Sequence, residues 1–175
     1  MATLLGAAAL NWPLGAAATT YFSTEEAQRA LFPSAQFAPV DIAMDRDFLK
    51  EVKSRTTMSL KPGKVQIWRV RAADREMGWF FVADVLGKHE DIRYALALDP
   101  GGAVKGVEVM EYRETHGDEV KERDWLAQFL GKQLGDDLKL GRGIDAISGA
   151  TLSCRHLSDG VHGLLMVHDR YLKAP

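Results

Sequence analysis

The feature that most constrains the fold is a series of four short strand-like runs in the middle of the chain, of which the first two are rich in Trp, Phe and Val. These runs have the composition of β-strands, and they cover residues 65–72, 77–86, 92–98 and 104–112. The turn sequence Asp99-Pro100-Gly101-Gly102 separates the last two and predicts an antiparallel hairpin. Helical patterns lie on either side of the four runs. The sequence therefore predicts an α+β fold, a twisted antiparallel sheet with helices packed on it.

Four segments outside these runs carry helical patterns. Ser23-Thr24-Glu25-Glu26 has the form of a capping box and predicts a helix that ends by Pro33. Residues 45–55 and 124–130 each predict a short amphipathic helix. Residues 153–172 place Leu157, Val161, Leu164, Leu165 and Leu172 on one face, which predicts a longer helix at the end of the chain.

The length and the composition shifts predict one domain with an apolar leader. A chain of 175 residues is within the usual range for a single domain. Residues 1–18 form the apolar segment, and residues 19–62 form a helical N-terminal part of the same domain. Residues 63–175 contain the four strands, the last helix and the candidate site.

Charge and cysteine content exclude several classes of function. The net charge of −2 excludes nucleic-acid binding driven by overall positive charge. The single cysteine, Cys154, excludes a disulfide framework, a Cys-rich zinc site and a CxxCH haem attachment within one chain. No Gly-x-Gly-x-x-Gly dinucleotide fingerprint occurs in the sequence. We expect neither a metal site nor a catalytic side chain.

Several individual side chains have a structural and a functional interpretation. His156, His162 and His168 are six residues apart, so they point in three directions from a helix, and we expect them on the surface. We expect His89 in an exposed turn, although it could also meet a cofactor edge. Cys154 is expected to be a small buried side chain; the alternative is a thiol whose pKa the helix dipole lowers. The aromatic residues Trp68, Trp79, Phe80 and Phe81 are expected in the core and on the sheet.

The N-terminal segment favours export. Residues 1–24 carry no charged side chain, and residues 2–18 are mostly Ala, Leu and Gly. With Pro13 inside it, this stretch is short for a membrane-spanning helix. Ala16 and Ala18 match the cleavage pattern of a secretory signal peptide. We therefore expect a periplasmic or otherwise extracytoplasmic protein, which the segment could keep near a membrane; the alternative is an apolar arm on a cytoplasmic protein.

The stretch before the last helix is the candidate site. Ser148, Gly149 and Ala150 are small, so a ligand could approach the backbone closely. Thr151 and Ser153 stand where the helix is expected to begin, and a helix N-terminus suits a phosphate group. A hydroxyl group there could hydrogen-bond a phosphate or be esterified to one. The alternative is an ordinary Ser or Thr N-cap.

The same residues resemble a known motif. Ser148-Gly149-Ala150-Thr151-Leu152-Ser153 is similar to the flavinylation motif Ser/Thr-Gly-Ala-Thr-x-Ser/Thr of the FMN-binding domain family, found in the sodium-pumping quinone reductase and the Rnf complex. Further similar segments follow the family order, at residues 106–117, 125–132, 145–147 and 158–161. His116 departs from the Pro or Tyr expected at that position.

The resemblance implies a cofactor, its attachment and a function. FMN would be joined through its phosphate to Thr151 by a separate flavin transferase that uses FAD and Mg²⁺. The chain would be an electron-transfer protein rather than a stand-alone enzyme, relaying electrons between redox partners. A flavin-based redox-sensing or binding module without sustained electron flux is the alternative. The implied cofactor-binding residues are Thr151 with Ser148, Gly149, Ala150, Leu152 and Ser153, Asp145 in the preceding loop, and Glu114, Thr115 and Gly117 at a strand end beside the flavin ring.

Overall fold

A single antiparallel sheet organises the molecule. The computed structural model describes residues 19–61, 63–114 and 116–173, so the predicted leader and Thr115 lie outside the described residues. The sheet has six strands in the order β1-β6-β5-β4-β3-β2, and every neighbouring pair is antiparallel. The strands are β1 (Thr19–Thr20), β2 (Gln36–Pro39), β3 (Gln66–Ala72), β4 (Arg75–Leu86), β5 (Asp91–Leu98) and β6 (Val104–Tyr112).

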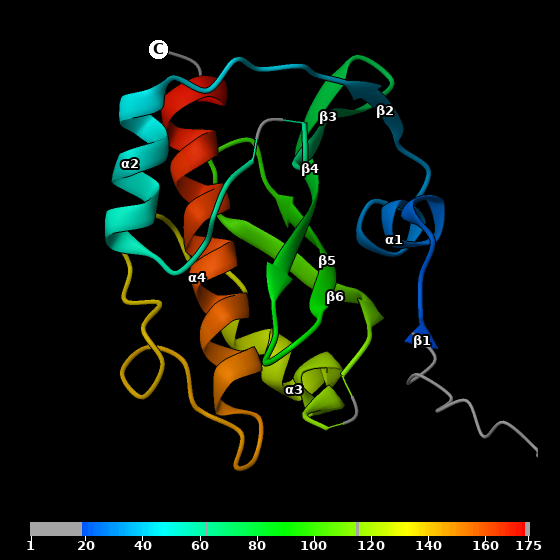
Figure 1. Ribbon diagram of the computed structural model, residues 1–175. Coiled ribbons are helices and arrows are strands. Elements are labelled where there is room, and N and C mark those ends of the chain that lie inside the picture. The colour runs from blue at the N-terminus through cyan, green and yellow to red at the C-terminus, as the bar shows by residue number, and fades with distance from the viewer. Residues whose placement is uncertain (1–18, 62, 115, 174–175) are drawn as a thin grey trace, which may run out of the picture.

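Helices cover both faces of this sheet. Helices α2 (Arg46–Arg55) and α4 (Thr151–Val167) lie on one face, and α1 (Thr24–Leu31) lies on the other (Figure 1). The short helix α3 (Arg123–Leu126) follows β6, between the 3₁₀ turns η1 (Asp118–Lys121) and η2 (Ala127–Phe129). A π-helical turn, η3 (His168–Leu172), extends α4. The predicted α+β class is confirmed.

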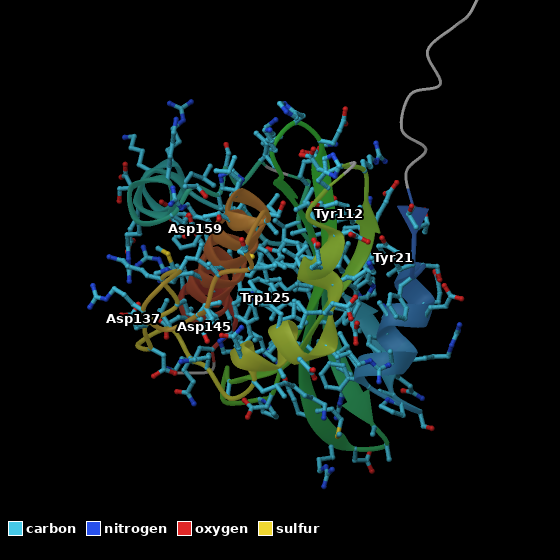
Figure 2. The ribbon with its side chains drawn as sticks, turned by 90° about the horizontal axis from the view of Figure 1, so that it is seen from below. Tyr21, Tyr112, Trp125, Asp137, Asp145 and Asp159 are labelled. Carbon is cyan, nitrogen blue, oxygen red and sulfur yellow. The ribbon has the colours of Figure 1, made fainter. Side chains whose placement is uncertain are left out.

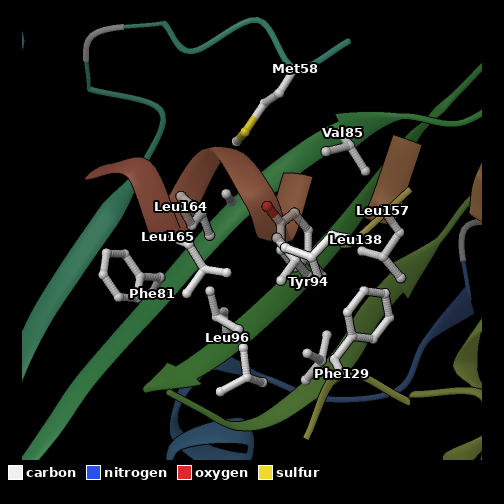
Figure 3. Close-up of a cluster of buried hydrophobic side chains, with 14 of the residues drawn as sticks. Met58, Phe81, Val85, Tyr94, Leu96, Phe129, Leu138, Leu157, Leu164 and Leu165 are labelled. Atoms are coloured by element: carbon white, nitrogen blue, oxygen red, sulfur yellow. The ribbon is translucent and has the colours of Figure 1, made fainter. Parts of the chain in front are cut away.

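The central strands β4 and β5 each contain a run of five buried apolar residues, Trp79–Ala83 and Tyr94–Leu98, because both faces of the sheet are covered there. Along β4, Phe81 faces α4 and belongs to the larger core cluster, whereas the adjacent Phe80 faces α1 and belongs to the smaller one. Figure 3 shows Phe81, Tyr94 and Leu96 of the sheet close to the leucines of α4. The expectation that Phe80 and Phe81 form core is therefore confirmed.

The N-terminal half departs from the prediction at two strands. The capping box at Ser23 is present, and Asp45 caps α2 as its N-cap residue. However, β1 and β2 were not predicted, and they form the two edges of the sheet. Both strands are short and mostly exposed, so their sequences lack the apolar alternation that identifies a strand.

The prediction of three surface histidines on the last helix is wrong. His168 is only 3% exposed and packs edge-on against Trp79, with the ring centroids 6.3 Å apart. His156 and His162 are half-buried. Burial lowers the pKa of both His162 and His168, because a charged imidazolium is poorly solvated there. The six-residue spacing does make the three rings point in different directions. Most of the surface of α4 is buried, however, so a different direction does not mean exposure to solvent.

Helix α4 approaches the sheet closely at a glycine. A Cβ atom at Gly160 would lie 2.6 Å from Val85 Cγ1 and 2.7 Å from Tyr94 Oη, and both side chains are buried. At Gly163, one turn further along, the nearest atom is 2.7 Å away, but it is the sulfur of the flexible Met58 side chain. Gly160 therefore sets how near the helix lies to the sheet.

Within the described residues, no helix has the length and apolar character needed to cross a membrane.

We predict that Gly160→Ala lowers the free energy of unfolding by about 1–3 kcal/mol, because overpacking the helix–sheet contact outweighs the higher helix propensity of alanine. Gly163→Ala is the matched control, since Met58 can move aside, and it should change stability by less than about 1 kcal/mol. Urea denaturation of both variants measures the difference. Equal stability of Gly160→Ala and the parent chain would contradict the close-approach argument.

Candidate functional site: a cleft at the start of helix α4

A cleft of about 680 Å³ opens where α4 begins. Three segments that are distant in sequence meet there: the turn between β4 and β5, the loop from β6 to η1, and the first turn of α4 with the glycine that precedes it. The lining residues are Lys88, His89, Glu114, His116, Gly117, Asp118, Glu119, Gly149, Ala150, Thr151, Leu152 and Ser153.

The first turn of α4 has no side-chain cap. Ala150 is the N-cap residue, so the expected alternative, in which Thr151 or Ser153 serves as an ordinary N-cap, is wrong. Thr151 is the first helical residue, and its side chain is exposed. The first amides of a helix have no partner within the helix and carry the positive end of its dipole. The cleft therefore presents a hydroxyl group beside backbone groups that suit an anion.

Two glycines with positive φ shape the cleft wall. Gly149 has φ +86°, a conformation that L side chains rarely adopt, and a Cβ atom there would meet nothing within 4 Å. Gly117 has φ +88°, and a Cβ atom there would lie 2.8 Å from Tyr112 Oη and 3.3 Å from the Cβ of Ala150. Gly149 is needed for the turn alone, whereas Gly117 also lets the β6–η1 loop pack against the start of α4.

Tyr112 joins that loop to the helix. Its hydroxyl group donates to the His116 carbonyl at 2.6 Å. Because this uses the one phenolic proton, the Ser153 hydroxyl donates to Tyr112 Oη across 3.2 Å. Burial raises the pKa of Tyr112, and the bond from Ser153 offsets part of the shift. Ser153 is itself 4% exposed, so its hydroxyl group is committed to Tyr112.

The loop before the motif is held by α3 and η2. The indole nitrogen of Trp125 donates to the Asp145 carbonyl at 2.7 Å, and the Asp145 amide donates to Gln128 Oε1 at 2.8 Å. Figure 2 places Trp125 inside the molecule and Asp145 nearer its edge. Both bonds use the backbone of Asp145, so they fix the path of the chain into residues 148–153.

The cleft brings together most of the residues that the sequence selected. Seven of them line it: Glu114, Gly117, Gly149, Ala150, Thr151, Leu152 and Ser153. Asp145 and Ser148 are exposed in the preceding loop and are not among the lining residues. The sequence reasoning missed Lys88, Asp118 and Glu119 as cleft residues, because no local motif marks them; His116 also lines the cleft, within the segment 106–117 that resembles the family. His89 is exposed, as expected, and lines the cleft.

Cys154 is a core residue rather than a redox group in the cleft. It is fully buried, and burial raises the pKa of its thiol, with a smaller opposing effect from backbone hydrogen bonds. The expectation of a small buried side chain is therefore confirmed.

Among the residues that the structure describes, no three His, Cys, Asp or Glu side chains are grouped as ligands for a metal ion.

Comparison with known proteins agrees with this site. Residues 87–165 match the family model described as the FMN-binding domain, a segment that includes the β4–β5 turn, the β6–η1 loop and the start of α4. This segment of the chain is therefore similar to an FMN-binding domain, and the match supports FMN as the cofactor. No curated protein matches the chain.

Two solved structures share the fold. One is NqrC from Shewanella oneidensis, with a TM-score of 0.57 and 19% identity over 85% of this chain and 87% of that one. The other is a subunit of the Na⁺-translocating NADH-quinone reductase from Parabacteroides distasonis, with a TM-score of 0.56 and 12% identity over 80% of this chain and 78% of that one. The chain is thus similar to NqrC in fold, beyond the segment that the family model covers.

We predict that Tyr112→Phe lowers the free energy of unfolding by about 1–3 kcal/mol, because it leaves the His116 carbonyl and the buried Ser153 hydroxyl without their partner. Ser153→Ala should cost less, since Tyr112 keeps its bond to His116. Chemical denaturation of both variants gives the comparison. A Tyr112→Phe variant as stable as the parent would show that the network does not hold the loop to α4.

Proposed function

We propose that this chain is a flavoprotein electron carrier whose FMN is attached to Thr151 by a phosphoester bond. The observation that carries the proposal is the exposed Thr151 hydroxyl on an uncapped helix start, within the segment that matches the FMN-binding domain. The residues fit such a group: the first amides of α4 suit a phosphate, and the cleft has room beside them.

Attachment would be a group transfer carried out by a separate flavin transferase with FAD as donor and Mg²⁺ present. A bond forms between Thr151 Oγ and the phosphorus next to the flavin, the bond between the two phosphates of FAD breaks, and AMP leaves. The proton of the Thr151 hydroxyl would be released to solvent, since AMP leaves as a phosphate anion. The chain's own part is to present that hydroxyl group and to place the start of α4 beside the phosphoester, which keeps about one negative charge.

The surroundings of Thr151 suit electron relay. Bound FMN would supply the ability to accept and release electrons. Leu152, 42% exposed, gives the cleft an apolar wall next to the attachment site, and the cleft opens to solvent for a redox partner. The solved relative from Parabacteroides distasonis is described as one subunit of an NADH-quinone reductase. By analogy, we propose that redox partners act on this chain in trans.

We also propose that the protein works outside the cytoplasm, in the periplasm or near a membrane. The support is the uncharged sequence of residues 1–24 with Ala16 and Ala18 before Thr19. Mass spectrometry of the N-terminus, on protein from the native envelope fraction, should find Thr19 as the first residue. An uncleaved chain in the cytoplasmic fraction would contradict this location.

We predict that co-expression with a flavin transferase adds the mass of FMN less one water, and that Thr151→Ala abolishes the addition. Thr151→Ser retains a hydroxyl group and should be modified in part. Ser153→Ala is the matched control, because the hydroxyl group it removes is buried against Tyr112, and it should be modified like the parent. Intact-mass spectrometry gives the result. A fully modified Thr151→Ala variant would overturn the assignment.

We predict that the purified flavinylated chain is reduced by dithionite and reoxidised by an artificial acceptor, yet oxidises NADH negligibly by itself. The reason is that the sequence offers no dinucleotide fingerprint for binding NADH. Absorbance at the flavin band and at the NADH band follows both reactions. Brisk NADH oxidation without a partner would identify the chain as an enzyme rather than a carrier.

A further inference from the structure

The turn between β4 and β5 forms one wall of the cleft but has little packing of its own. Leu86 and Asp91 are the last paired residues of the two strands, and the Gly87 amide donates to the Glu90 carbonyl at 2.7 Å. Lys88, His89 and Glu90 are all exposed. An exposed turn without buried side chains opens readily unless other groups hold it. Lys88 and His89 nevertheless line the cleft.

Glu114 binds the amides of this turn. Its Oε1 accepts hydrogen bonds from the His89 amide and, at 3.0 Å, from the Glu90 amide. The contact is close, since a Cβ atom at Gly87 would lie 2.8 Å from the same oxygen. Burial pushes the pKa of Glu114 upward, but the amides of residues 88–90 outweigh it and lower the pKa overall. The carboxylate is therefore engaged with the turn.

His156 binds the carbonyl groups of the same turn from helix α4. Its Nδ1 lies 3.0 Å from the Gly87 carbonyl oxygen and also contacts the Leu86 carbonyl oxygen. Because a carbonyl oxygen can only accept, Nδ1 carries the hydrogen. The turn is thus held by a carboxylate on its amides and an imidazole on its carbonyl groups. In Figure 1 the β4–β5 turn lies beside the first turn of α4.

We propose that Glu114 and His156 are positioning residues: Glu114 holds the β4–β5 turn to the end of β6, His156 holds it to helix α4, and together they fix Lys88 and His89 as a wall of the cofactor cleft. Glu114 then acts through the turn rather than through its charge on the flavin ring. The effect on the cofactor rests on the proposed function, whereas the effect on the turn does not.

Amide hydrogen exchange on the full chain without flavin tests whether Glu114 and His156 hold the β4–β5 turn in place. Glu114→Ala should speed exchange at His89 and Glu90 by roughly tenfold or more, because each amide loses a charge-assisted bond. Glu114→Gln keeps an acceptor oxygen and should stay within about threefold of the parent. His156→Phe should speed exchange in the same turn. Glu119→Ala, which removes a charge from the same cleft, is the control and should leave the turn unchanged.

Iodide quenching of flavin fluorescence in the flavinylated chain tests the consequence for the cofactor. Glu114→Ala and His156→Phe should raise quenching, and Glu114→Gln should not. Unchanged exchange in Glu114→Ala would overturn the proposal, as would equal exchange or equal quenching in Glu114→Gln and Glu114→Ala. If Thr151 carries no flavin, the proposed function fails, but the exchange result still decides whether the turn is fastened.

Discussion

The packing of α4 across the sheet is the contact on which the site depends. The helix runs over β4 and β5 with Leu157, Leu164 and Leu165 fully or almost fully buried, and Gly160 sets its distance from Tyr94. This contact determines where the helix begins. Thr151 therefore lies at the same end of the sheet as the end of β6 and the β4–β5 turn. The cleft lies where helix α4 and strand β5 begin and where strands β4 and β6 end.

The residues around the cleft divide into two kinds. Thr151 and Leu152 present their side chains to the open space, and they follow one another in the sequence. Tyr112, Trp125 and Glu114 instead use their polar atoms on the backbone of neighbouring loops. A cofactor site on loops needs such support, because exposed turns do not hold their own shape. The polar atoms of Tyr112, Trp125 and Glu114 therefore hold the loops that form the cleft in place.

The sequence predicted the parts of the fold that local pattern determines. Strands β4 and β5 contain continuous apolar runs because both of their faces are buried, and the residues from Ser148 to Ser153 are contiguous. Both features could therefore be recognised from the sequence alone. Strands β1 and β2 could not, because their pairing is tertiary and their residues are mostly exposed. Lys88 and Asp118 also line the cleft, but they are distant in sequence from residues 148–153, and only the folded chain brings them there. The start of α4 was placed two residues late, since Ala150 gives no capping signal.

If Thr151 is esterified as we propose, the missing side-chain cap on α4 has a consequence for how the protein matures. A helix whose first amides lack a partner frays easily at that end. An unmodified chain would therefore offer Thr151 on a loose terminus, which a modifying enzyme can draw into its own active site. Once esterified, the phosphate would occupy the position that a serine or aspartate holds in other helices. Loading the cofactor would then complete the secondary structure, and the finished terminus would no longer be a good substrate.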